Sequence, residues 1–218
     1  MTQTEPQPDI TPDQHLALRH AAIRLAREFD GTFGIETIEH ALQTSYEHLA
    51  QNATVTTHLP LLAERFARRR LHALAKLDGS SHDVRPAVLF LCVHNAGRSQ
   101  MALGFFAHYA GDCAIAWSGG SEPADQVNPT AVAVMAERGI DITAEHPKPW
   151  TDEILRAADV VITMGCGDTC PVYPGKRYED WQLDDPAGRD IADVRRIRDQ
   201  IERRVRQLLD QLAVPAGG

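Results

Sequence analysis

The 218 residues of the chain are 43% hydrophobic and 24% charged, close to the averages of folded, water-soluble proteins. These proportions exclude a disordered, a collagen-like or a membrane-embedded chain. The 22 basic and 30 acidic residues give a net charge of -8 at pH 7, which is the wrong sign for neutralising a phosphate backbone. We therefore expect no nucleic acid and no membrane among its partners.

The start of the chain lacks the features of an export signal. Met1 to Asp9 contain neither a basic segment nor an apolar core, and no later stretch reaches the roughly 18 apolar residues of a membrane helix. We expect a cytoplasmic protein. In a reducing compartment its four cysteines are more often catalytic, redox-active or metal-binding than cross-linked. All four follow residue 90.

The first part of the chain has the pattern of a small helical bundle. Residues 1–10 are polar and contain two prolines, which predicts a flexible N-terminus. Three segments with apolar residues at helical spacing follow: 11–29, 35–50 and 59–77. Thr11 begins the first of them with a capping box and a proline at the first helical position. The sequence predicts a three-helix bundle over 11–79 and a linker at 80–85.

The polar side chains of this bundle indicate no chemistry of their own. The seven histidines of the first 85 residues are scattered along the sequence and form no tight group, which predicts no metal site. A basic cluster in the third segment is predicted to be a solvated face: Arg65, Arg68, Arg69 and Arg70. Three roles stay open for the bundle, namely stabilising the rest of the protein, self-association and docking of a partner.

From Pro86 onward, strand-like and helix-like segments alternate. The predicted strands are 87–92, 113–118 and 160–164, and the predicted helices are 99–110, 128–138, 151–157 and 191–212. This alternation predicts a parallel sheet covered on both faces, with a site at the carboxyl ends of the strands. Residues 165–190 are expected to form a long loop. Cys113, at the start of the second strand, is expected to pack as a small apolar side chain.

The loop after the first strand carries the strongest chemical signal. Cys92 ends the strand, and Arg98 follows six positions later, where the next helix begins. Backbone N–H groups and a helix N-terminus suit an oxyanion there, and the same positive field favours a thiolate that Ser99 can hydrogen-bond. Cys92 is the predicted nucleophile. The predicted oxyanion-binding residues are Val93, His94, Asn95, Ala96, Gly97 and Arg98.

The longer pattern CxxNxxRSQMA, which begins at Cys92, resembles the active-site loop of the low-molecular-weight protein tyrosine phosphatase superfamily, in its arsenate reductase branch. Further stretches resemble the same family in the same order: SGGSEPA from Ser118, NP from Asn128, GIDI from Gly139, MGCGDTCP from Met164 and EDWQLDDP from Glu179. The resemblance covers residues 86–212. It implies an α/β domain over 86–218 with a four-stranded parallel sheet flanked by helices. The helical part before it resembles an extension of some actinobacterial members.

The resemblance implies roles for one carboxyl group and two thiols. Asp185 matches the general acid of the family, with adjacent Asp184 as its alternative. Cys166 would displace arsenite from Cys92, and Cys170 would then form a disulfide with Cys166 that thioredoxin reduces. Arsenate and thioredoxin are thus the implied partners. The oligomeric state is left open.

Other interpretations remain beside the reductase. The two thiols are separated by three residues, a shorter spacing than in the thioredoxin-coupled reductases of the family, so a small thiol such as mycothiol is an alternative donor. A low-molecular-weight phosphatase would need only Cys92, Arg98 and Asp185. A regulatory module without activity is the third interpretation.

We expect no bound cofactor and no metal. A zinc ion usually needs four nitrogen or sulfur ligands. The residues after Pro86 offer Cys166 and Cys170 but no second cysteine pair, and they contain only three histidines. Potassium-binding members of the family have Glu directly after Gln-Met-Ala, and this chain has Leu103 there. We therefore expect no potassium site of that type.

Overall fold

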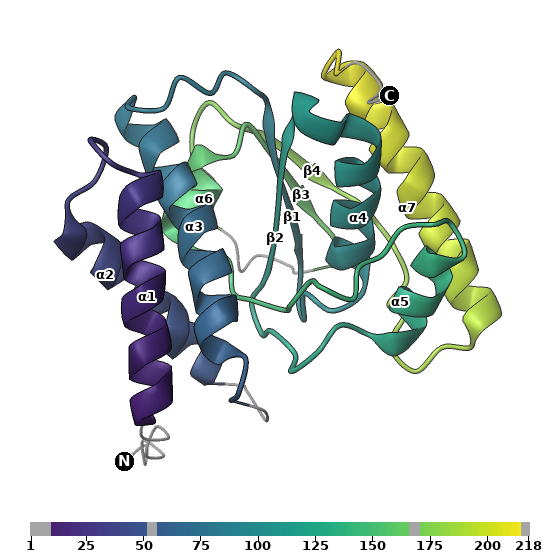
Figure 1. The fold of residues 1–218 in the computed structure, drawn as a ribbon. Coiled ribbons are helices and arrows are strands. Elements are labelled where there is room, and N and C mark those ends of the chain that lie inside the picture. Colours follow the sequence, from purple (N-terminus) through teal and green to yellow (C-terminus); the bar gives the residue numbers. More distant parts are fainter. Residues whose placement is uncertain (1–9, 52–55, 166–170, 215–218) are drawn as a thin grey trace, which may run out of the picture. The chain divides into compact units, whose positions relative to one another are not determined.

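A computed structural model of the chain describes residues 10–51, 56–165 and 171–214 (Figure 1). The chain divides into two compact units, Met1–Ser81 and His82–Gly218, and each is described by itself. In the described ranges, no helix combines the length and the apolar character that a bilayer span requires.

The first unit contains the three predicted helices, which are confirmed: α1 (Pro12–Glu28), α2 (Ile35–Ala50) and α3 (Leu59–Asp78). Thr11 accepts from the backbone N–H of Gln14, and the Gln14 side chain accepts in return from the backbone N–H of Thr11, so the predicted capping box is present. Each helix packs against the other two. Their buried faces form the core of this unit.

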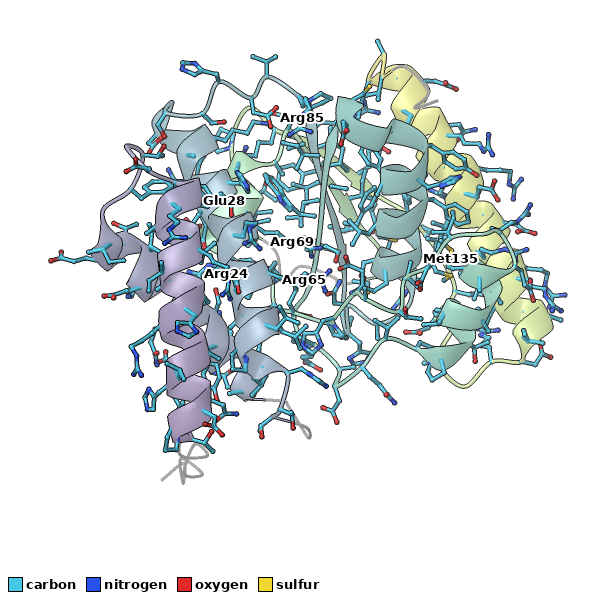
Figure 2. The ribbon with its side chains drawn as sticks, in the orientation of Figure 1. Arg24, Glu28, Arg65, Arg69, Arg85 and Met135 are labelled. Atoms are coloured by element: carbon cyan, nitrogen blue, oxygen red, sulfur yellow. The ribbon has the colours of Figure 1, made fainter. Side chains whose placement is uncertain are left out.

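A charged network joins α1 to α3, and Figure 2 labels its two members on α1, Arg24 and Glu28. Arg24 donates to both carboxylate oxygens of the buried Glu64, and Arg68 bridges Glu28 at 2.7 Å and Glu64 at 3.1 Å. The hydrogen bond from Arg24 is the main reason that the pKa of Glu64 is lowered, against the opposing effect of burial. The prediction of a solvated face is therefore wrong for Arg68, because a buried carboxylate requires such cations. It is also wrong for Arg70, whose guanidinium donates to two side chains of α2.

The second unit is built on a four-stranded parallel sheet in the order β2-β1-β3-β4, which confirms the predicted fold class. The strands are β1 (Ala87–Cys92), β2 (Ile115–Gly120), β3 (Val160–Thr163) and β4 (Arg177–Asp180). All six residues of β1 are buried, as expected of a central strand covered on both faces.

Helices cover both faces of this sheet (Figure 1). They are α4 (Arg98–Ala110), α5 (Pro129–Ala136) and α7 (Ile191–Gln211) on one face and α6 (Asp152–Ala157) on the other. The core between the sheet and helices α4, α5 and α7 includes Phe90, Phe106 and Met135, of which Figure 2 labels Met135. This core holds α4 against the end of β1, which fixes both ends of the loop between them.

Three sequence-based assignments in this unit are corrected. Strand β2 begins at Ile115 rather than at 113, because Gly111–Cys113 form the short 3-10 helix η1. Cys113 is exposed, so the prediction that it packs as an apolar side chain is wrong. Strand β4 lies in the stretch predicted to be a loop. It is an edge strand without a buried residue, so it lacks the apolar run that marks the other strands.

An ion-pair cluster joins α5 to α7. Glu137, the residue after α5, accepts hydrogen bonds from Arg195 at 2.6 Å and from Arg198 at 2.8 Å. The buried Arg198 also donates to the carbonyl of Val134 at 2.9 Å. The Arg195 hydrogen bond, followed by that of Arg198, lowers the pKa of Glu137 from 4.5 to about 2. The carboxylate is thus favoured in the folded state.

Replacing Glu137 with Gln should make this unit less stable at neutral pH and remove part of its acid sensitivity. The unfolded carboxyl group takes up a proton near its ordinary pKa of 4.5, and the folded one only near about 2. The stabilisation is therefore complete above about pH 5 and is lost as the pH falls toward 2. Urea unfolding of both proteins across this range measures it. A stability difference that does not shrink on acidification contradicts the assignment.

Candidate active site

Cys92 lies at the topological switch point of the sheet, where the connections from β1 run to opposite sides. It is the last residue of the central strand β1, it is 2% exposed, and Gly120 of β2 is its partner in the register. The chain continues from β1 to β2 on one side and to β3 on the other, so a crevice forms outside the carboxyl end of β1. Topology thus places the predicted nucleophile where ligands of such sheets bind.

The loop between β1 and α4 directs its carbonyl oxygens outward. Three of them accept from backbone N–H groups of the segment after β2: Val93 from Glu122 at 2.9 Å, His94 from Ala124 at 3.0 Å and Ala96 from Asn128 at 2.9 Å. The C=O and N–H of a trans peptide point in opposite directions, so the N–H groups of these peptide units face the inner side of the loop. The loop therefore presents donors to its concave side.

A cavity of about 30 Å³ occupies that concave side. Its lining consists of Cys92, His94, Ala96, Gly97 and Arg98 from the loop with Asn128, Asp185, Pro186 and Ala187 from elsewhere in the unit. The structure thus brings together the predicted nucleophile, arginine and acid. Val93 and Asn95, which were also predicted to bind the oxyanion, do not line this cavity.

Asn95 instead forms hydrogen bonds with residues that do not line the cavity. It is buried and has a φ of 46°, a left-handed conformation that asparagine tolerates better than most residues. Its side-chain oxygen accepts from the backbone N–H of Lys148 at 3.0 Å and from Nε2 of Gln100 at 3.2 Å. These two donors orient the amide so that its Nδ2 donates to Ser99 at 2.8 Å.

Ser99 connects this amide to the nucleophile. Its hydroxyl oxygen accepts from Asn95 and lies 3.0 Å from the sulfur of Cys92. Since an ionised sulfur cannot donate, the Ser99 hydroxyl is the donor to a Cys92 thiolate. Sequence reasoning predicted the contact of Ser99 with Cys92 but missed Gln100 and Lys148. Gln100 lies within the recognised motif, whereas no sequence signal marked Lys148.

Arg98 and Asp185 form an ion pair at the mouth of the cavity. The Arg98 side chain is 8% exposed, and its Nη2 donates to Oδ2 of Asp185 at 2.8 Å. The other carboxylate oxygen of Asp185 accepts from the backbone N–H of Ala187 at 2.9 Å. Asp184, the alternative acid, lies 3.6 Å from Arg189 and is mostly exposed. The geometry therefore favours Asp185 over Asp184 as the carboxyl group of this site.

The proposed resolving thiols, Cys166 and Cys170, lie outside the described residues. Gly165, directly before them in the sequence, has a φ of +76°, and a Cβ added to it would lie 2.9 Å from Nη1 of Arg98. The end of β3 is also bonded to β1, because the N–H of Met164 donates to the carbonyl of Leu91 at 2.8 Å. Gly165, the last described residue before both cysteines, is therefore close to the guanidinium of the site.

One titratable group beside the loop has a strongly shifted pKa. Burial, followed by the Lys148 ammonium group, lowers the pKa of His146 to about 4, and Glu145 opposes this shift. His146 is thus neutral at pH 7, and its backbone carbonyl accepts from Gln100 at 3.4 Å. Within the described ranges, no three His, Cys, Asp or Glu side chains gather in a way that could hold a metal ion.

Replacing Ser99 with Ala removes the donor to the Cys92 thiolate. Because a hydrogen bond to a charged group contributes about 1.5–3 kcal/mol, we expect alkylation of Cys92 by iodoacetamide at neutral pH to slow about tenfold. Mass spectrometry of the Cys92 peptide measures this rate, and exposed Cys113 is the internal reference. An unchanged ratio of the two rates would mean that the Ser99 hydroxyl does not stabilise the sulfur anion.

Replacing Gly165 with Ala should weaken binding of a tetrahedral anion about tenfold, because the new methyl group displaces Arg98 and the φ is unfavourable for alanine. Inorganic phosphate is the probe and calorimetry the measurement. Gly175→Ala is the matched control, since Gly175 has a φ of +81° and nothing within 4 Å of its added Cβ. Equal losses in both variants would show general strain rather than a contact with Arg98.

Comparison with known proteins extends these observations. The pattern of the low molecular weight phosphotyrosine protein phosphatase family matches residues 87–215, and that of the protein-tyrosine-phosphatase-like N-terminal domain matches residues 18–75. The structure of a Corynebacterium glutamicum thioredoxin-dependent arsenate reductase is 46% identical in sequence, with a TM-score of 0.82, and the match covers 90% of this chain and 96% of that chain.

Two further relatives match the second unit. The arsenate reductase of Halalkalibacterium halodurans is 40% identical over 132 residues, which are 56% of this chain and 94% of that protein. The structure of an arsenate reductase in the phosphate binding state is 36% identical, covers 58% of this chain and 98% of that chain, and has a TM-score of 0.51.

Proposed function

The chain belongs to the low molecular weight phosphotyrosine protein phosphatase family, in its arsenate reductase branch, and we propose that it reduces arsenate to arsenite with Cys92 as the nucleophile. One observation carries this proposal. Cys92, Arg98 and Asp185 line one small cavity beside the loop, whose carbonyl oxygens are held by hydrogen bonds from the segment after β2. This set of groups suits attack by a thiolate on a tetrahedral oxyanion.

In the first step the Cys92 thiolate attacks arsenic. Arg98 and the loop N–H groups hold the oxygens, whose negative charge would otherwise repel the sulfur anion. A sulfur–arsenic bond forms and an arsenic–oxygen bond breaks. Asp185 protonates the departing oxygen, which leaves as water. Ser99 holds the thiolate beforehand through the contact of 3.0 Å.

In the second step arsenic gains two electrons from the cysteines. The Cys166 thiolate attacks the sulfur of Cys92, a disulfide forms between them, and the electron pair of the sulfur–arsenic bond leaves with arsenic as arsenite. Cys170 then attacks Cys166, which frees Cys92 and gives a Cys166–Cys170 disulfide. The closeness of Gly165 to Arg98 supports the participation of Cys166, because Gly165 directly precedes it in the sequence.

Thioredoxin is the proposed donor that reduces this disulfide. The similarity to the C. glutamicum enzyme, which is described as thioredoxin-dependent, supports the choice over nearly the whole chain. No bound cofactor enters the scheme. Mycothiol stays the alternative donor, because the three-residue spacing of Cys166 and Cys170 is short for the proposed exchange.

Phosphatase activity is the second candidate function. The same cavity accepts phosphate, which has nearly the shape and charge of arsenate. After Asp185 and Pro186 the cavity is lined by Ala187, however, and not by an aromatic side chain that could pack on a phenyl ring. A small free oxyanion therefore fits the site better than phosphotyrosine.

The proposal is tested by NADPH oxidation with arsenate, thioredoxin and thioredoxin reductase. Cys92→Ser and Cys166→Ser should abolish turnover, and Cys170→Ser should lower it at least about 100-fold, since each removes a thiol that the electron route needs. Cys113→Ser is the matched control and should retain full activity, because exposed Cys113 lies in η1, outside the cavity lining.

Two outcomes would contradict parts of the scheme. Thioredoxin-coupled turnover that survives both Cys166→Ser and Cys170→Ser would show that these thiols do not resolve the arsenic adduct. Turnover with mycothiol but not with thioredoxin would replace the proposed donor. Hydrolysis of p-nitrophenyl phosphate without any arsenate reduction would assign the protein to the phosphatases instead.

A further inference from the structure

We propose that Asp185 acts as an internal counter-anion that occupies Arg98 in the empty site, and that an incoming oxyanion displaces it and thereby releases the general acid. The proposal rests on the function proposed above, because it assigns Asp185 a second task at the same site. It concerns the order of events, namely that the acid becomes available only when an oxyanion has taken its place on the guanidinium.

The burial of Arg98 is the first argument. A guanidinium that is 8% exposed has lost most of its hydration and needs a compensating anion. In the cavity without an oxyanion, the carboxylate of Asp185 fills this need at 2.8 Å. The Asp185 side chain itself is 47% exposed, so it can leave for water at a much smaller cost than Arg98 could.

The engagement of both carboxylate oxygens is the second argument. Oδ2 accepts from Arg98, and Oδ1 accepts from the backbone N–H of Ala187. A carboxyl group held by two donors in this way acts as an acceptor, whereas the proposed reaction needs it as a proton donor to the departing oxygen. At least the bond to Arg98 must therefore open before the chemical step.

The charge of the substrate supplies the reason for opening. A tetrahedral dianion in the cavity and the Asp185 carboxylate are two anions that compete for one guanidinium. They also repel each other, because Asp185 is among the residues that line the cavity. Arg98 has little room to move so as to hold both anions, because a methyl group added at Gly165 would lie only 2.9 Å from its Nη1. The doubly charged ligand in the cavity outcompetes the single charge at its rim. The released carboxylate then takes up one proton from solvent, and this is the proton that it passes to the departing oxygen in the proposed reaction.

Binding of inorganic phosphate to the full-length reduced protein tests this exchange. Asp185→Asn removes the competing charge, so the affinity for phosphate should rise about fivefold or more. Asp184→Asn is the matched control. It removes the same charge one residue away, from a carboxylate that lies near Arg189 and not near Arg98, and it should change the affinity less than twofold. Asp185→Ala serves as a second variant if Asp185→Asn does not fold, as judged by circular dichroism.

Two results would overturn the proposal. Similar gains in Asp184→Asn and Asp185→Asn would show a general effect of charge rather than competition for Arg98. Weaker phosphate binding in Asp185→Asn and Asp185→Ala would show that the carboxylate positions Arg98 for the oxyanion instead of competing with it. Neither measurement depends on arsenate reduction, so failure of the proposed function and failure of this exchange are distinguishable.

Discussion

The site depends on one constraint, which is the burial of a guanidinium next to a sulfur at the end of a buried strand. Arg98 begins α4 and is held there by the packing of this helix against β1, β2 and α7. Its positive charge cannot be left without an anion at this depth. Asp185 provides the anion within the chain, and the cavity beside Cys92 provides room for another. The chemistry proposed for the site follows from which of the two anions occupies the guanidinium.

The orientation of the loop peptides is set by groups that do not line the cavity. The segment after β2 binds the loop carbonyls from outside, and Asn95 accepts a hydrogen bond from the N–H of Lys148 behind the loop. Binding of a ligand and orientation of the loop peptides are thus carried out by different residues. The cavity residues remain available to a ligand, while the outer hydrogen bonds fix their N–H groups in advance, which is the condition for electrostatic stabilisation without reorganisation.

Sequence reasoning predicted those features that a local pattern can encode. The buried run of β1, the glycine-containing loop and the capped helices all have strong local signals, and the motif from Cys92 to Ser99 placed the nucleophile beside its donor. Strand β4 was not recognised from the residues because an edge strand with polar side chains carries no apolar run. The contact of Asn95 with Lys148 was missed because it joins residues 53 positions apart in the sequence. The contact with Gln100 is local, but nothing in the motif shows which way the two amides point. The ion pair of Arg98 with Asp185 was missed because it also joins residues far apart in the sequence, although both residues had been selected individually.

The order of the parallel strands also bears on how the two proposed half-reactions could use one cation. An anion cavity that accepts arsenate cannot by its shape alone reject phosphate, so reduction requires thiols delivered from outside the cavity. Strand β3 lies beside β1, with Thr163 paired to Leu91, and a Cβ added at Gly165, two residues after the strand ends, would lie 2.9 Å from the Arg98 guanidinium. The loop after β1, which carries the proposed nucleophile, and Gly165, the last described residue before Cys166, therefore both lie close to Arg98. In the proposed reaction, the guanidinium that binds the oxyanion is thus near the residue that precedes the proposed resolving thiols in the sequence.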